Sequence, residues 1–101
     1  MLLEFSVIPL GRGRSVSADI ADLVKIIEAS GLDYRLTATG TILEGNWEQV
    51  MEVARKCHTE MRKKTERVVT FMKLDDYADH TGRLSAAVAS VEAKVGKAVK
   101  K

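Results

Sequence analysis

The order of apolar and polar positions along the chain predicts strands and helices in alternation. Apolar and polar side chains alternate from Leu3 to Pro9, which is typical of a half-buried strand that ends at its proline. A helix is then predicted to begin at a cap on Ser15 or Ser17 and to end at Gly31. The apolar face of this helix consists of Ile20, Leu23, Val24 and Ile27, and Asp19 lies in its first turn.

The stretch from Tyr34 to Gly45 is predicted to form a β-hairpin. We place its turn at Thr39 and Gly40, because a glycine in second place suits the positive φ of a tight turn. The predicted cross-strand pairs are Ala38 with Thr41, Thr37 with Ile42, Leu36 with Leu43, and Arg35 with Glu44. The last of these pairs would form an ion pair across the hairpin.

Three further elements are predicted after the hairpin. Asn46 is placed to cap a helix whose apolar positions continue down to the basic residues 62–64. The run from Arg67 to Asp75 is rich in β-branched and aromatic residues and predicts a fourth strand. A third amphipathic helix is indicated by the helical spacing of Leu84, Val88, Val91 and Val95.

The resulting order of elements, β-α-β-β-α-β-α, predicts an α+β fold. Two split βαβ units around a central hairpin form the ferredoxin-like βαββαβ arrangement, with an antiparallel sheet ordered 4-1-3-2. Right-handed crossovers then place the first two helices on one face of the sheet, and the third helix is an extra C-terminal element. A chain of 101 residues is long enough for one such domain.

The opposite face of the predicted sheet carries a mixture of charged, hydroxyl and apolar side chains. Four of these are apolar and would be exposed in a monomer, so we expect a face-to-face dimer or a tetramer. The polar members would line a small ligand pocket at that interface. The residues of this face are Glu4, Ser6, Ile8, Arg35, Thr37, Ile42, Glu44, Val69, Phe71 and Lys73.

Composition and charge narrow the functional classes. The net charge is only +2, and the lysines near the C-terminus have no aromatic neighbours, which argues against a nucleic-acid partner. The single cysteine, Cys57, excludes an intrachain disulfide and predicts a reducing, cytoplasmic environment. No apolar run approaches the roughly 18 residues of a membrane helix, so no membrane partner is expected.

No catalytic residue, metal site or cofactor is predicted. Cys57 and His58 are neighbours on a helix, where adjacent side chains diverge by about 100°, and no other His or Cys lies nearby in the sequence. The loop from Gly11 to Ser15 could offer amides and two arginines to an anion, but it matches no phosphate-binding motif.

Three segments of the chain resemble the thiamine-binding protein family, also known as the UPF0045 or DUF77 family. They are V-I-P-L-G at Val7–Gly11, G-T-I-L-E-G at Gly40–Gly45 followed by Trp47, Val50 and His58, and K-L-D-D at Lys73–Asp76. The chain departs from the family pattern at Tyr77 and at Ala38–Thr39, where the pocket rim would be altered.

The resemblance implies a single thiamine-binding-protein-like domain over residues 1–101. It further implies a cytoplasmic homotetramer, built from paired sheets, that binds thiamine or its hydroxymethylpyrimidine moiety without catalysis. The residues that would supply carboxylates, hydroxyls and apolar walls to this ligand are Glu4, Ser6, Thr37, Ile42, Glu44 and Phe71.

Other interpretations of these residues and of the chain remain open. The two carboxylates could instead form ion pairs, Glu44 with Arg35 and Glu4 with Lys73. The chain could also be a regulatory or assembly module of the ACT or PII kind. An acylphosphatase-like hydrolase shares the fold, but it would need an asparagine on the third strand, where none occurs.

Overall fold

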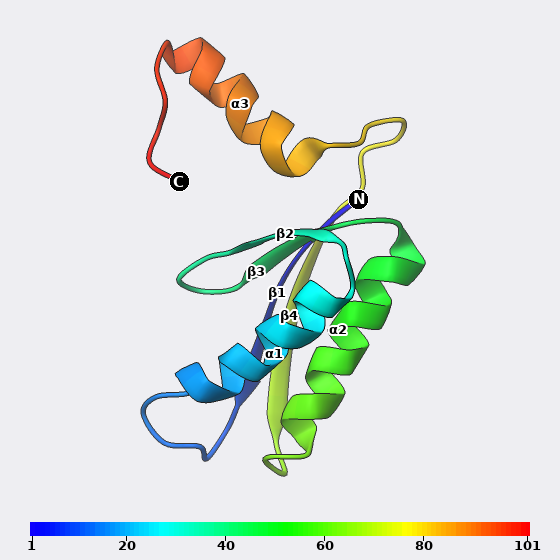
Figure 1. The fold of residues 1–101 in the computed structure, drawn as a ribbon, viewed down its shortest axis with the longest axis vertical. Coiled ribbons are helices and arrows are strands. Elements are labelled where there is room, and N and C mark those ends of the chain that lie inside the picture. The colour runs from blue at the N-terminus through cyan, green and yellow to red at the C-terminus, as the bar shows by residue number, and fades with distance from the viewer.

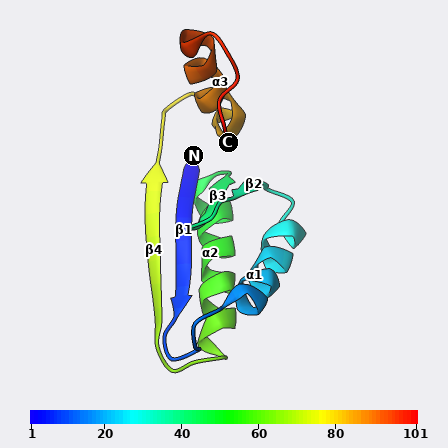
Figure 2. The same ribbon diagram turned by 90° about the vertical axis from the view of Figure 1, so that its left-hand side faces the viewer.

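The computed structural model describes residues 1–101 as a four-stranded antiparallel sheet with three helices. The sheet is ordered β2-β3-β1-β4, and α1 and α2 cover one of its faces (Figures 1 and 2). The predicted ferredoxin-like fold with an extra C-terminal helix is therefore confirmed. The elements are β1 (Leu2–Pro9), α1 (Ser17–Ala29), β2 (Asp33–Leu36), β3 (Thr41–Glu44), α2 (Trp47–Arg62), β4 (Val68–Asp75) and α3 (Arg83–Val95).

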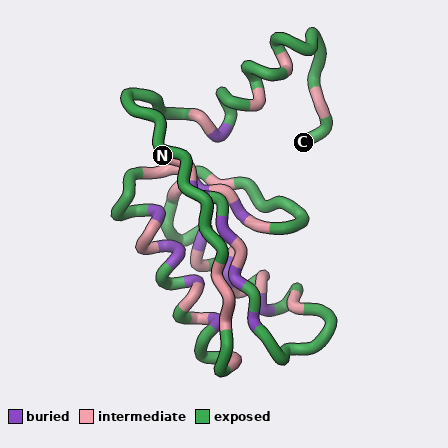
Figure 3. The backbone as a smooth tube through the Cα atoms, turned by 180° about the vertical axis from the view of Figure 1, so that it is seen from behind, coloured by how far each residue is buried: buried purple, intermediate pink, exposed green.

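The core lies between the sheet and the two covering helices. The odd-numbered residues of β1 from Leu3 onward are buried, and α2 supplies the largest share of the buried residues, which are coloured purple in Figure 3. Cys57 of α2 is fully buried, and its thiol donates a weak hydrogen bond to the carbonyl oxygen of Leu23 at 3.9 Å. The core residues are Leu3, Phe5, Val7, Leu23, Ile27, Leu43, Val50, Val53, Ala54, Cys57 and Met61.

The start of α2 is fixed by a reciprocal capping box. The Asn46 side chain accepts from the Gln49 amide at 2.9 Å, and the Gln49 side chain accepts from the Asn46 amide at the same distance. The predicted cap at Asn46 is therefore confirmed.

The predicted side-chain cap of α1 is wrong. Val16 occupies the N-cap position, and no side chain there accepts from the first-turn amides. The hydroxyls of Ser15 and Ser17 lie 3.4 Å from each other instead. Asp19 is in the first turn as predicted, but its carboxylate binds Arg12 and Lys64 from other parts of the chain.

The hairpin register also differs from the prediction, because the turn lies one residue earlier. The observed partners are Asp33 with Glu44, Tyr34 with Leu43, Arg35 with Ile42, and Leu36 with Thr41. The Thr37 amide donates to the Gly40 carbonyl at 2.8 Å, which makes Ala38 and Thr39 the central turn residues. The Thr37 hydroxyl accepts from the Gly40 amide at 3.1 Å and so replaces the usual carbonyl acceptor.

This shift keeps the side chains of β2 and β3 on their predicted faces, because the register moves by two residues, but Thr37 and Ala38 now lie in the loop. It removes the predicted ion pair, since Arg35 now lies opposite Ile42 rather than Glu44. Gly40 does not have a positive φ, so the predicted reason for a glycine there is wrong as well.

The third helix projects beyond the end of the sheet (Figures 1 and 2). Its only buried residue is Leu84, while Val91 and Val95 are each 53% exposed. Its first turn is held by Glu44, which accepts from the amides of Arg83 at 2.8 Å and Leu84 at 3.0 Å. The structure contains no helix with the length and apolar character needed to cross a membrane.

Candidate functional site

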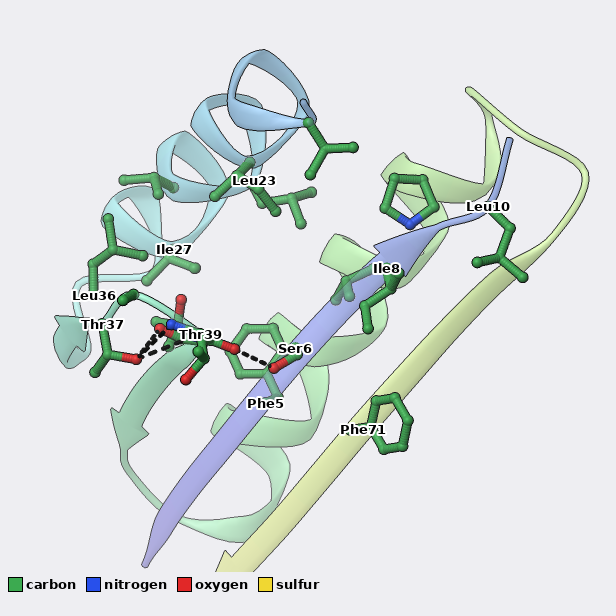
Figure 4. Close-up of a pocket in the computed structure, with 18 of the residues that line it drawn as sticks. Phe5, Ser6, Ile8, Leu10, Leu23, Ile27, Leu36, Thr37, Thr39 and Phe71 are labelled. Carbon is green, nitrogen blue, oxygen red and sulfur yellow. Dashed lines mark hydrogen bonds between the residues drawn. The ribbon is translucent and has the colours of Figure 1, made fainter. Parts of the chain in front are cut away.

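The candidate site lies where β1 continues beyond its pairing with β3. β1 pairs with β3 only from Leu2 to Phe5, whereas it pairs with β4 as far as Pro9. The residues from Ser6 to Pro9 therefore have no strand neighbour on the β3 side. The β2–β3 loop and α1 enclose the space beside this free edge (Figure 4).

The space beside the free edge is a cavity of about 580 Å³, which we call the inner cavity. It is lined by mostly apolar side chains, including Leu23 and Ile27 of α1 and Leu36 at the end of β2 (Figure 4). The volume falls in the range of pockets that take small molecules and cofactors. Further lining comes from Phe5, Ser6, Val7, Ile8, Leu10, Val16, Ile20, Val24, Thr39, Gly40 and Phe71.

A second, more polar depression of about 320 Å³ adjoins the inner cavity, and we call it the outer hollow. Both are lined by Ser6, the Thr39–Gly40 segment and Phe71, so they meet at these residues. The outer hollow adds Glu4 and Lys73, which are opposite each other on β1 and β4. An apolar slot and a charged depression thus share one boundary.

Ser6 fixes the boundary between the two spaces. Its hydroxyl donates to the Thr39 carbonyl at 2.8 Å, which ties the hairpin loop to β1 (Figure 4). Gly40 approaches β1 so closely that an added Cβ would lie 2.9 Å from both the Phe5 carbonyl oxygen and the Ser6 hydroxyl. The glycine is therefore required by this contact rather than by its φ angle.

Glu4 and Lys73 form the ion pair that the sequence offered as an alternative role for Glu4. Their charged atoms lie 3.3 Å apart, with side chains 47% and 75% exposed. Exposed pairs of this kind contribute only about 0–1 kcal/mol, so the pair can open at little cost. Glu4 is therefore available to a cationic ligand in the outer hollow.

The remaining predicted site residues occupy three different positions. Phe71 is 59% exposed and lies on the face of the sheet away from the helices. Ile42 lies on the same face, opposite Glu4 on the neighbouring strand. Thr37 lies in the hairpin loop and lines the inner cavity, and its hydroxyl donates to the Gly40 carbonyl at 2.9 Å. Both carboxylate oxygens of Glu44 accept hydrogen bonds from the first amides of α3. Glu44 lines neither the inner cavity nor the outer hollow.

The loop from Gly11 to Ser15 forms part of the rim of the inner cavity through Gly13 and Arg14. Arg12 does not line the inner cavity, and its guanidinium donates two hydrogen bonds to the Asp19 carboxylate at 3.0 and 3.2 Å. The hydrogen bond from Arg12, together with one from Lys64, lowers the pKa of Asp19 below its usual value. The sequence did not predict the contacts of Asp19 with Arg12 and Lys64, since Lys64 lies far from Asp19 in the chain.

His58 and Cys57 have separate structural positions. The Nδ1 atom of His58 lies 2.6 Å from the Thr70 hydroxyl, which ties α2 to β4. Burial of Cys57 raises the pKa of its thiol to about 11. The structure contains no group of three His, Cys, Asp or Glu residues that could hold a metal ion.

Comparison with known proteins identifies relatives over nearly the whole chain. The thiamine-binding protein family matches residues 3–92. The UPF0045 protein MJ1052 of Methanocaldococcus jannaschii is 30% identical over 79 residues, which cover 78% of this chain and 79% of the relative. A UPF0045 protein of Mycobacterium bovis is 31% identical over 93 residues, which cover 91% of each chain.

Solved structures show the same fold. The crystal structure of MJ1052 matches with a TM-score of 0.83 at 27% identity, covering 89% of this chain and 93% of that one. A Thermotoga maritima structure described as a thiamine biosynthesis/salvage protein matches with a TM-score of 0.72 at 18% identity, covering 85% and 94% of the two chains. The family match supports a role in binding a small molecule. The chain belongs to the thiamine-binding protein family.

Proposed function

We propose that this protein binds thiamine or its hydroxymethylpyrimidine moiety reversibly and does not transform it. The observation that carries the proposal is the junction of the inner cavity and the outer hollow at Ser6 and Phe71. Thiamine joins a flat aminopyrimidine to a permanently positive thiazolium. An apolar slot beside a depression that contains a carboxylate matches these two parts.

The free edge of β1 supplies hydrogen-bonding groups for the aminopyrimidine. The Leu10 amide donates to the Arg67 carbonyl at 3.0 Å, so the even-numbered residues of β1 direct their backbone groups toward β4. Backbone groups alternate in direction along an antiparallel strand, which turns the amide and carbonyl of Val7 toward the inner cavity. A ring that carries both donors and acceptors can pair with this edge.

Glu4 is the carboxylate that we assign to the positive ring. Its only ionic partner is the exposed Lys73, whereas the two oxygens of Glu44 are occupied by the first turn of α3. Phe71 supplies an aromatic wall on the neighbouring strand, and Ile42 lies beside Glu4 on β3. Thr37 lines the inner cavity, and its hydroxyl also shapes the loop that borders the cavity.

A second copy of the chain completes this site in the proposal. The sheet face away from α1 and α2 exposes Ile8 by 41% and Phe71 by 59%, and nothing within the chain covers them. Packing two such faces together would bury this apolar surface and close the outer hollow, giving a tetramer when such dimers pair.

Isothermal titration calorimetry with thiamine, and separately with hydroxymethylpyrimidine, tests the proposal. We expect Glu4→Gln to weaken thiamine binding by about ten- to a hundredfold, because it removes one charge-assisted contact. Glu28→Gln is the matched control, since Glu28 is exposed on α1 outside both spaces and has no ion pair. Chromatography of the recovered ligand should show it unchanged.

Two results would contradict the proposal. One is the absence of measurable binding of either compound by the native protein. The other is unchanged thiamine affinity in Glu4→Gln, which would place the ligand elsewhere. Native mass spectrometry of gently purified protein reports the bound compound and the subunit number in one measurement.

A further inference from the structure

The outer hollow contains one charge of each sign. Glu4 and Lys73 line it from the neighbouring strands β1 and β4, and their charged atoms lie 3.3 Å apart. No other charged side chain lines this depression. The outer hollow is therefore neutral as a whole, but it offers a carboxylate and an ammonium group next to each other.

Two further carboxylates flank this pair in the sheet, and both already have partners. Glu44 on β3 and Asp75 on β4 lie opposite Leu2 from its two sides. Glu44 accepts from two amides of α3, and Asp75 lies 2.9 Å from the guanidinium of Arg83. A negative group that enters the outer hollow therefore meets the uncompensated charge of Glu4 alone.

A ligand with a single positive charge cannot satisfy both members of the Glu4–Lys73 pair. It takes the place of the Lys73 ammonium beside Glu4, and two cations then lie close together over one carboxylate. Like charges at such distances repel each other, and the repulsion is stronger at a protein surface than in bulk water because the effective dielectric constant is lower. Thiamine itself therefore binds Glu4 against the opposition of Lys73.

We propose that the preferred ligand of this site is a phosphate ester of thiamine, with the thiazolium on Glu4 and the phosphate on Lys73. The inference rests on the function proposed above and names the form of the ligand that the charges favour. A phosphate monoester carries a charge of about −1.5 to −2 at pH 7. Lys73 thus gains a partner when it gives up Glu4, and every charged group has a neighbour of opposite sign.

The rows of the sheet place the two ends of this ligand in the right order. Ser6 and Phe71 are opposite each other at the boundary of the inner cavity (Figure 4), and Glu4 and Lys73 are opposite each other in the next row. Side chains that are directly opposite on antiparallel strands have Cβ atoms about 4.5–5.5 Å apart. The short ethyl arm that carries the phosphate on the thiazole ring spans a distance of this order.

The position of Lys73 suits a phosphate better than a buried ammonium would. Its side chain is 75% exposed on the edge strand β4, so a phosphate held there stays partly hydrated and loses little solvation. A lysine also binds phosphate as a point charge, without a fixed geometry. The contact therefore recognises the charge of the phosphate, and the open edge leaves room for a diphosphate as well as a monophosphate.

Isothermal titration calorimetry of the full chain with thiamine, and separately with thiamine monophosphate, tests the inference. We expect the native protein to bind the monophosphate about five- to tenfold more tightly than thiamine. In Lys73→Gln this preference should reverse, because the phosphate loses its ammonium and still faces Glu4. Thiamine should bind this variant at least as tightly as it binds the native protein, since Lys73 no longer competes for Glu4.

Lys25→Gln is the matched control. Lys25 is 78% exposed, also forms an ion pair with a carboxylate, and lines neither the inner cavity nor the outer hollow. This variant should keep the native preference, and circular dichroism checks that both variants fold. Higher ionic strength should shrink the difference between the two ligands in the native protein, because salt screens exposed charges.

Three results would overturn the inference and leave the proposed function standing. They are native protein that binds thiamine at least as tightly as the monophosphate, a Lys73→Gln protein that keeps the native preference, and a Lys25→Gln protein that loses it. Absence of binding by both compounds would instead overturn the proposed function, and this inference with it.

Discussion

Gly40 is the residue at which the hairpin loop touches the central strand. An added Cβ would lie 2.9 Å from the Phe5 carbonyl oxygen, which belongs to the backbone and cannot move aside without disturbing β1. The loop position in turn sets the boundary between the inner cavity and the outer hollow. A single residue without a side chain thus controls both the register of the hairpin and the shape of the site.

We therefore expect Gly40→Ala to lower the free energy of unfolding by about 1–3 kcal/mol, the usual cost of forcing extra atoms into a packed site. Urea denaturation measures this change. In a Ser6→Ala background the penalty should shrink but persist, because the hydroxyl contact is gone and the Phe5 carbonyl remains. A Gly40→Ala protein as stable as the native one would refute the role assigned to this contact.

Asp19 makes the stability of the first loop depend on acid. The Arg12 hydrogen bond, and then those from Lys64, hold the pKa of Asp19 below its ordinary value in the folded protein. A carboxyl with a lowered folded pKa contributes stability that is complete above the unfolded pKa of about 3.9. That stability is lost as the pH falls from there through the folded pKa.

Asp19→Asn should accordingly flatten the dependence of stability on pH below about pH 4, and it should lower stability at pH 7. Thermal unfolding across a pH series measures both effects. Glu28→Gln serves as the comparison, since this exposed carboxylate has no ion pair. If the Asp19→Asn curve keeps the native slope in acid, the Arg12 and Lys64 contacts do not act as described.

At the scale of elements, the sequence predicted what short stretches determine by themselves. The cap of α2 was predictable, because Asn46 and Gln49 satisfy each other within a single turn. The start of α1 was not, because Asp19 is fixed by Lys64, which lies just after the end of α2. The hairpin turn was misplaced by one residue, because the Thr37 hydroxyl and the contact of Gly40 with β1 outweigh the glycine's torsional preference.

The candidate site was predictable only in part for the same reason. Strand alternation alone places Glu4, Ser6 and Phe71 on the face away from the helices. The inner cavity depends on β3 ending its pairing at Phe5 while β1 runs on to Pro9, which no local pattern reveals. The spacing of the apolar residues predicted the apolar face of α1, but it could not show that this face lines a cavity.

Glu44 acts as a cap for α3 across a long stretch of sequence. We expect Glu44→Ala to weaken the first turn of α3 by about 0.5–2 kcal/mol, as loss of a helix cap does. Hydrogen exchange should show faster exchange of the Arg83 and Leu84 amides, with Glu44→Gln intermediate because it keeps an acceptor. Exchange in α2 should not change, and equal acceleration there would indicate general destabilisation instead.

The whole molecule measures 46 × 29 × 20 Å and keeps two surfaces of its sheet uncovered. One is the face away from α1 and α2, and the other is the outer edge of β4 (Figure 2). Phe71 belongs to both, since it projects from that face at the middle of that strand. Its substitution by a charged residue should therefore disturb the packing of two such faces.

Sedimentation at micromolar concentration should accordingly show a tetramer for the native protein and a smaller species for Phe71→Glu. The reason is that a buried, unpaired charge is too costly for the packed sheet faces to tolerate. A native monomer, or a Phe71→Glu protein that remains tetrameric, would contradict this picture of assembly.

The buried thiol of Cys57 makes the rate of its chemical modification a measure of how often the core opens. The side chain has 0% exposure at the centre of the core, and burial raises its pKa to about 11. A thiol reagent cannot reach the buried side chain until the sheet and α2 separate. In the closed core at neutral pH, the thiol also stays protonated, whereas the reactive form is the thiolate. Since no other cysteine competes, the rate of modification counts openings of the native core, in unaltered protein and without any attached label.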